Sequence, residues 1–137
     1  MEQRTTLAER RLRGRAGPPP PGVDYRLARR AILRDLRRGL RSRVDVCDAH
    51  PELLRAGRNI GEPLREPCPV CESRDLRAVF FTYEGRNARK GRARRPEDVR
   101  ALRDHPAEID CYVVEVCLDC NWNHLVRQFV TGTRRAV

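Results

Sequence analysis

Two pairs of cysteines with the same spacing constrain this chain more than any other feature of its sequence. Two residues separate Cys68 from Cys71, and two residues separate Cys117 from Cys120. Four thiolates in two such pairs form the ligand set of a tetrahedral zinc ion, and a closed set of four sulfurs leaves no position open for water or substrate. The sequence therefore predicts one structural Zn²⁺ held by these four cysteines.

The segment between the two cysteine pairs is unusually long. Such pairs are commonly separated by ~15–20 residues, and the distance from Cys71 to Cys117 is much greater. Residues 85–95 are rich in glycine and arginine and predict a flexible basic loop, and Pro96 to about Arg103 predicts a short helix. The free energy of closing a loop grows only logarithmically with its length. We therefore expect an insertion at 85–104 that leaves the metal site intact.

Three segments around the cysteines have the composition of β-strands. Residues 76–83, 109–116 and 122–130 are rich in β-branched and aromatic side chains. The second and third of these segments flank the second cysteine pair, which places that pair at the tip of an antiparallel hairpin. We therefore expect a zinc ribbon in which a three-stranded antiparallel sheet is joined to the first cysteine pair through the metal.

The N-terminal half has helical periodicity instead. Asp24 is placed to cap a helix whose apolar residues recur every three or four positions, and Gly39 is placed to end it. Ser42 and Asp45 resemble a capping box, and Pro51 suits the first turn of a further helix. The sequence therefore predicts a small cluster of helices before the ribbon.

These elements make the chain an α+β protein. Its first residues combine arginines with a run of prolines and have little to bury, so we expect a disordered tail there. The expected divisions are a basic, proline-rich tail at 1–22, a helical segment at 23–66, the zinc ribbon at 67–131 and a C-terminal tail at 132–137.

The residue after the last cysteine of each pair affects how the chain turns there. Asn121 tolerates the left-handed backbone conformation that glycine commonly supplies at this position. Glu72 occupies the equivalent position in the first pair and is less permissive. Glu72 therefore argues against an ideal geometry for the first turn.

The remaining cysteines and the histidines offer a second candidate site. Cys47 and His50 are also separated by two residues, and together with His105 and Cys111 they provide the ligand types of a Cys₂His₂ zinc site. The simpler interpretation is that His50 begins a helix and that the two cysteines are small buried side chains. His124 lies in an alternating strand, where a structural role is simpler than that of a substitute ligand or a partner contact.

The chain carries a net charge of +10, which favours an acidic partner such as nucleic acid. Lys90 is its only lysine. A GC-rich genome produces such an excess of arginine without functional pressure, so the distribution of charge is more informative than its total. Two basic clusters stand out, and each is either a phosphate-binding surface or simply solvated. The candidate phosphate-binding residues are Arg30, Arg34, Arg37 and Arg38 in the first helix, and Arg86, Arg89, Lys90, Arg92, Arg94 and Arg95 in the loop.

Several other functional classes find no support in the sequence. No apolar run approaches the ~20 residues that a membrane span needs, and the N-terminus lacks the apolar segment of a signal peptide, so we expect a cytoplasmic protein that does not enter a membrane. Thiols stay reduced in that compartment, so six cysteines favour a metal over disulfides. We find no catalytic grouping and no open metal site, and we expect neither an enzyme nor a small-molecule substrate.

Four stretches of the sequence resemble a family of short actinobacterial proteins that is known only as a domain of unknown function. The stretches are DYRLARRAILRDL, VCDAHPELLRAGRNIGEP, CPVC and YVVEVCLDCNWNHL, and the resemblance spans about residues 23–130. It implies an actinobacterial origin and a cytoplasmic protein, and it implies no activity, partner or catalytic residue. The ribbon half is also similar in architecture to the zinc ribbons of transcription and translation proteins.

Together these observations favour a non-enzymatic zinc-ribbon protein of the gene-expression machinery. We expect it to associate with RNA polymerase or the ribosome and to contact RNA or DNA phosphates through its two basic clusters. The alternative is a zinc-stabilised protein–protein adaptor that holds an acidic partner without binding nucleic acid. In that case the arginines solubilise the fold or meet carboxylates.

Overall fold

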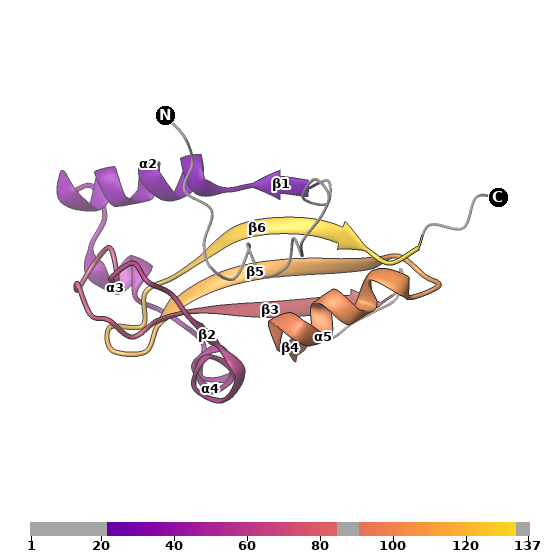
Figure 1. Ribbon diagram of the computed structural model, residues 1–137. Helices are drawn as coiled ribbons and strands as arrows, with labels where there is room; N and C mark the ends of the chain where they lie inside the picture. Colours follow the sequence, from indigo (N-terminus) through magenta and orange to yellow (C-terminus); the bar gives the residue numbers. More distant parts are fainter. Residues whose placement is uncertain (1–21, 85–90, 134–137) are drawn as a thin grey trace.

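The computed structural model describes residues 22–84 and 91–133, and the fold of this part is α+β (Figure 1). One antiparallel sheet has the strand order β1–β6–β5–β3–β2, and β4 also pairs with β3. The three central strands are the three that the sequence predicts. They are β3 (Leu76–Glu84), β5 (Ile109–Cys117) and β6 (Asn123–Thr131).

The sheet is larger than the sequence predicts, because three short strands extend it to six. β1 (Gly22–Asp24) pairs with β6 at one edge, and β2 (Glu62–Pro63) and β4 (Arg92–Arg94) pair with β3 at the other edge. Each of these strands has only two or three residues, so no alternation of apolar and polar side chains reveals it. The structure therefore corrects the prediction of a three-stranded sheet. It also corrects part of the predicted basic loop, because Arg92–Arg94 form strand β4.

Four helices of the described part pack around the sheet, and a 3₁₀ turn continues the last of them. The helix expected in the insertion is present. The elements are α2 (Arg26–Arg37), α3 (Arg43–Val46), α4 (Pro51–Ile60), α5 (Pro96–Ala101) and the turn η1 (Leu102–Asp104).

The helix boundaries follow the signals in the sequence. Ser42 and Asp45 form the expected capping box at the start of α3. The N-cap residue of α2 is Tyr25 instead of Asp24, but Asp24 Oδ1 accepts the backbone N–H of Arg26 at 2.9 Å and so satisfies one donor of the first turn. Gly39 follows α2 with a φ of +76°, a conformation that favours glycine.

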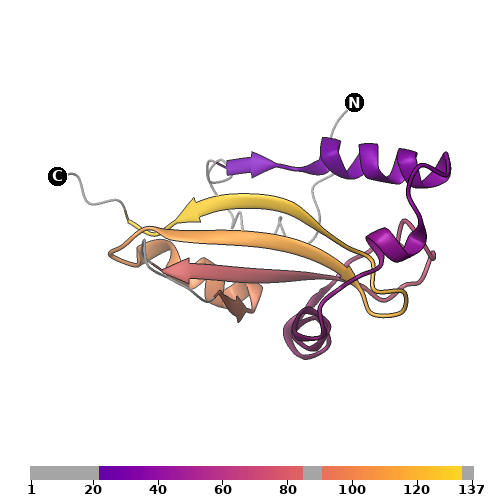
Figure 2. The same cartoon turned by 180° about the vertical axis from the view of Figure 1, so that it is seen from behind.

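The sheet is packed on both faces. Neighbouring residues of a strand point to opposite sides, so one strand contributes side chains to two core clusters. Leu33 of α2 joins Phe80 and Trp122 in the larger core cluster. Leu54 of α4 packs against a smaller cluster that includes Val79. Figures 1 and 2 accordingly show α2 and α4 on opposite sides of the sheet. In the described ranges, no helix is both long enough and apolar enough to pass through a lipid bilayer.

Candidate metal centre and basic surface

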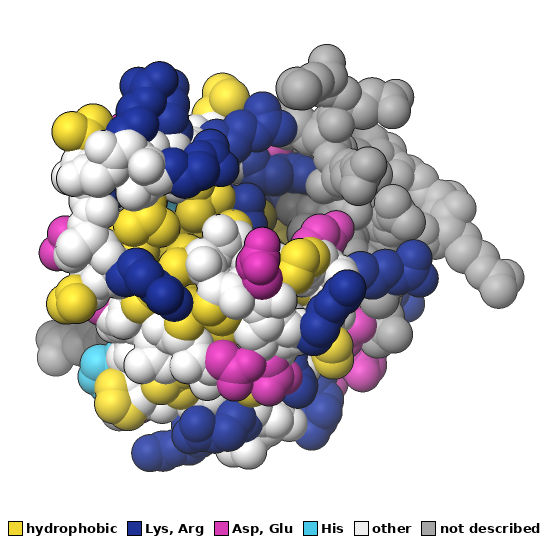
Figure 3. Space-filling model, turned by 90° about the vertical axis from the view of Figure 1, so that its left-hand side faces the viewer, with side chains coloured by type: hydrophobic (Ala, Val, Ile, Leu, Met, Phe, Trp, Pro, Cys, Tyr) yellow, Lys and Arg dark blue, Asp and Glu magenta, His cyan; other side chains and the backbone are white. Residues whose placement is uncertain are grey.

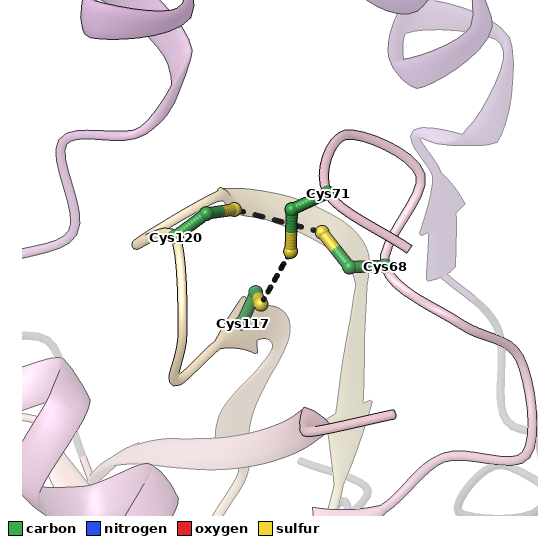
Figure 4. Close-up of side chains that lie close together, drawn as sticks. All are labelled: Cys68, Cys71, Cys117 and Cys120. Atoms are coloured by element: carbon green, nitrogen blue, oxygen red, sulfur yellow. Dashed lines mark hydrogen bonds between the residues drawn. The ribbon is translucent and has the colours of Figure 1, made fainter. Parts of the chain in front are cut away.

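The four paired cysteines converge at one end of the sheet (Figure 4). Cys68 and Cys71 lie in the turn before β3, Cys117 is the last residue of β5, and Cys120 lies in the turn before β6. The Sγ atoms of all four lie within 4.8 Å of one another. The Sγ atoms of Cys68 and Cys120 are 3.7 Å apart, and those of Cys71 and Cys117 are 3.6 Å apart.

These separations suit four sulfurs around one tetrahedral cation. A Zn–S bond is about 2.3 Å long, so tetrahedral geometry places neighbouring sulfurs roughly 3.8 Å apart. Burial raises the pKa of the Cys68 thiol, so a cation that binds there must displace a proton. The site can therefore hold one divalent ion that prefers sulfur ligands.

The two cysteine turns have the same backbone structure although their sequences differ. The N–H of Glu72 donates to the carbonyl of Cys68, and the N–H of Asn121 donates to the carbonyl of Cys117, both at 3.0 Å. In both turns the first cysteine's N–H also donates to a carbonyl further along the chain, at 2.8 Å. Glu72 and Asn121 both have positive φ values, 64° and 69°. Glu72 thus adopts the left-handed conformation despite its side chain, and the first turn is as regular as the second.

Contacts other than the sulfurs also join the two turns. The Ser73 hydroxyl donates to the carboxylate of Asp119, and the N–H of Leu118 donates to the carbonyl of Asp75 at 3.1 Å. Within the first turn, the N–H of Val70 points at Cys68 Sγ at 3.4 Å. The protein itself therefore aligns the sulfurs of the two turns.

A fifth cysteine, Cys47, lies beside the four, and sequence reasoning did not place it there. Its Sγ is 3.8 Å from Sγ of Cys120. Cys47 is the C-cap residue of α3, and burial raises the pKa of its thiol to about 11. Its spacing in the sequence linked it to His50 instead. The only sequence signal for this position is that residue 47 is a cysteine. Its contact with Cys120 results from the packing of α3 against the second cysteine turn.

The other members of the second candidate site are dispersed. His50 is the N-cap residue of α4, and its Nδ1 accepts the N–H of Glu52 at 3.1 Å. His105 Nδ1 accepts the N–H of Ala107 at 3.1 Å. Cys111 is fully buried in β5, and burial raises the pKa of its thiol to about 12. These residues therefore do not form a Cys₂His₂ site with Cys47.

His124 is packed against an aromatic ring and does not join the sulfurs. Its ring stacks on that of Trp122, with centroids 5.9 Å apart and planes 13° from parallel. Burial lowers the pKa of the imidazole. Its Nδ1 is buried and has no hydrogen-bond partner among the residues described. His124 thus has the structural position that its strand pattern suggests.

The arginines predicted on the first helix are all exposed. Arg30, Arg34, Arg37 and Arg38 lie on α2 or at its end. None of the four forms an ion pair with a residue that the structure describes, and the one acidic residue of the helix, Asp35, lies 3.8 Å from Arg41 instead. Within residues 22–84 and 91–133, no acidic side chain therefore pairs with these four guanidinium groups.

The arginines predicted in the insertion are less uniform. Arg92 and Arg95 are exposed. Arg94 is engaged inside the protein, because its Nε donates to Thr82 Oγ1 at 3.0 Å and a terminal nitrogen donates to Glu84 Oε1 at 3.4 Å. The rest of this predicted cluster, Arg86, Arg89 and Lys90, lies outside the described residues.

The described residues of the two basic clusters lie at opposite edges of the sheet. The helix α2 follows the edge strand β1, whereas β4 pairs at the opposite edge of the sheet (Figures 1 and 2). Figure 3 shows the end of the molecule beside α2 and α3, where arginine side chains project around a face on which hydrophobic side chains are also visible. Three of the exposed apolar residues belong to this region: Leu27 is 69% exposed, Leu40 is 72% exposed and Val44 is 81% exposed.

Residues 21–137 match the family described as "Family of unknown function (DUF5318)", and the chain belongs to this family. The uncharacterized protein Rv0049 of Mycobacterium tuberculosis is 40% identical over 114 residues, which are 82% of this chain and 83% of that protein. The uncharacterized protein Mb0050 of Mycobacterium bovis has the same identity and coverage. The expected resemblance to an actinobacterial family of unknown function is thus confirmed. No solved structure matches the chain.

Proposed function

We propose that this protein is a non-enzymatic zinc-ribbon protein of the gene-expression machinery. In this proposal one structural Zn²⁺ holds the fold, and the arginines of α2 bind RNA or DNA phosphates while the protein associates with RNA polymerase or the ribosome in the cytoplasm. The observation that carries the proposal is the set of exposed α2 arginines that have no acidic partner among the described residues. The zinc ligands would be Cys68, Cys71, Cys117 and Cys120.

The metal part of the proposal is supported by the two matched turns. They present four sulfurs at tetrahedral spacing, and Zn²⁺ favours this ligand set over harder oxygen donors. Four protein ligands leave no position for a substrate, so the ion would stabilise the fold and perform no reaction. The tip of the β5–β6 hairpin would thereby be fixed to the turn before β3, which is the arrangement of a zinc ribbon.

The phosphate part of the proposal is supported by the position of the arginines along α2. Arg30, Arg34 and Arg38 are spaced four residues apart, and Arg37 adjoins them, so the four lie along one side of the helix. Guanidinium groups bind phosphate oxygens through paired hydrogen bonds as well as charge. A row of such groups on one helix suits the regularly spaced phosphates of a nucleic acid.

The test is a binding titration with fluorescent single-stranded RNA and duplex DNA at several salt concentrations. Replacing Arg30, Arg34, Arg37 and Arg38 by glutamine is expected to weaken binding at least tenfold and to flatten its salt dependence by roughly 0.7–0.9 in logarithmic slope for each lost contact. The matched control replaces Arg55 and Arg58, which are exposed on α4, and is expected to change little. Absent or salt-insensitive binding would refute the proposal, and equal losses in both variants would refute the role of α2.

A protein–protein adaptor is the second candidate, and the exposed apolar residues near the same arginines favour it. Leu40 and Val44 would contribute contact area to a protein partner and nothing to a phosphate. Capture of partners from cells with and without nuclease separates the candidates, because an adaptor keeps its acidic protein partner after nuclease treatment. Replacing Leu40 and Val44 by serine is expected to abolish that capture only if the adaptor function is correct.

A further inference from the structure

We propose that Cys47 and Cys120 form a disulfide when the zinc-loaded protein meets a peroxide, and that this bond releases the metal. The inference rests on the zinc site of the proposed function and adds a redox response to it. It starts from the 3.8 Å distance between the two Sγ atoms. A disulfide bond is about 2.05 Å long, so the sulfurs need to approach by only about 2 Å.

The backbone around Cys47 is held against the second cysteine turn by two hydrogen bonds. The N–H of Ala49 donates to the carbonyl of Asn121 at 3.0 Å, and Asn123 Nδ2 donates to Asp48 Oδ1 at 2.9 Å. Both bonds join a residue that lies one or two positions after Cys47 to a residue that lies one or three positions after Cys120. The two thiols are therefore neighbours because of the fold, and their proximity does not depend on two mobile side chains meeting by chance.

This pair differs from the other close sulfur pairs in two respects. Cys68 is 1% exposed and Cys117 is 0% exposed, so the pairs Cys68–Cys120 and Cys71–Cys117 each contain a buried thiol. Cys47 and Cys120 are both only half-buried, which gives a peroxide access to them. Cys47 is also outside the four-cysteine ligand set, so it is the neighbouring thiol that a bound metal would leave unligated.

The chemistry needs one peroxide molecule as the oxidant. One sulfur, as a thiolate, attacks the peroxide, the O–O bond breaks, hydroxide leaves, and that cysteine becomes a sulfenic acid. The second sulfur, as a thiol, then attacks the sulfenic sulfur, so that the S–S bond forms and water leaves with the thiol proton. Two electrons pass from the two cysteines to the peroxide. The disulfide removes Cys120 from the ligands and leaves three cysteines, which bind the ion more weakly.

The experiment treats the full-length, zinc-loaded protein with hydrogen peroxide and follows zinc release with a metallochromic indicator. Peptide mass spectrometry identifies the first disulfide. We expect a Cys47–Cys120 link that appears at the same rate as free zinc and that dithiothreitol with added zinc reverses. Cys47→Ser and Cys47→Ala should both keep a full equivalent of zinc before treatment and release it at least fivefold more slowly. Cys111→Ala, which removes a buried thiol outside the four-cysteine cluster, should release zinc at the rate of the wild type.

The outcomes distinguish this inference from the zinc site itself. Less than one equivalent of bound zinc before oxidation overturns the zinc site and the inference together. A full equivalent of zinc with a first disulfide between two of the four ligands overturns the inference alone. Equal rates of release from wild type and Cys47→Ser, or a sulfinic acid at Cys47 without any disulfide, overturn it as well.

Discussion

The indole Nε1 of Trp122 donates a 3.0 Å hydrogen bond to Oε1 of Glu115 inside the core. The guanidinium of Arg29 pairs with the same carboxylate oxygen from α2. Trp122 is 0% exposed and Glu115 is 5% exposed, so this carboxylate is buried where both partners can reach it. The Glu115 side chain thereby connects α2, which carries the exposed arginines, to the strands on either side of the second cysteine turn.

Replacing Glu115 by alanine is expected to lower the free energy of unfolding by about 3 kcal/mol, because it leaves a buried indole N–H and a partly buried guanidinium without their acceptor. Glu115→Gln keeps an oxygen for Trp122 and removes only the charge, so its expected cost is about 1–2 kcal/mol. Urea unfolding of the zinc-loaded variants measures both. Equal costs for the two variants would show that the hydrogen bond from Trp122 contributes nothing.

Replacing Cys71 or Cys117 by serine is expected to release the zinc and to unfold the β5–β6 hairpin tip, because metal affinity in a structural site is folding free energy. Metal analysis measures the zinc, and amide hydrogen exchange reports the loss of protection at the two turns. Cys111→Ala is the matched control, since this buried thiol lies outside the four-cysteine cluster. It should lower stability and keep the metal. A full equivalent of zinc in both ligand variants would contradict the assignment.

The parts of the fold that could be predicted depend on signals that are local in the sequence. The spacing of Cys68 and Cys71 and of the second pair identifies four candidate metal ligands, and the structure brings all four together. The capping box of Ser42 and Asp45 is likewise complete within four residues of chain. The three central strands are nine residues long, which is enough for their composition to be distinctive.

The parts that could not be predicted depend on contacts between distant segments. Cys47 and Cys120 are 73 positions apart, and Arg29 and Glu115 are 86 positions apart. No spacing rule relates such residues, so only the packing of α2 and α3 against β5 and β6 brings them together. The strand β4 was missed for another reason, because its sequence Arg-Ala-Arg has no β-branched or aromatic residue and its strand conformation comes from pairing with β3.

The glycine at the end of α4 is expected to be more sensitive to substitution than the glycine after α2. A Cβ atom at Gly61 would lie 2.3 Å from the carbonyl oxygen of Gly57, which is backbone and cannot rotate away. Gly61→Ala should therefore shift the junction between α4 and β2 and cost about 2–3 kcal/mol. Gly39 has a φ of +76° but no neighbour within 4 Å, so Gly39→Ala should cost only the conformational strain, about 1 kcal/mol. Thermal unfolding ranks the two, and the reverse order would contradict the described junction.

Zinc affinity is expected to fall steeply as the pH falls. Thiols ordinarily titrate near pH 8.5, and burial raises the pKa of Cys68 further in the metal-free protein. A bound ion needs cysteine thiolates as ligands, so the ion must displace a proton from Cys68 when it binds. Because a bound zinc ion lowers the pKa of its cysteine ligands, zinc affinity is greatest at high pH and is lost as the pH falls. Each released proton should lower the apparent affinity about tenfold per pH unit.

Calorimetric zinc titrations in buffers of different ionisation enthalpy count the released protons directly. The wild type should release protons from its four ligands, and Cys47→Ser should release the same number, because Cys47 is a neighbour of the ligand set and not a member of it. A smaller number for Cys47→Ser would mean that Cys47 replaces one of the four paired cysteines at the metal. An affinity independent of pH would mean that the cysteine sulfurs do not bind the ion.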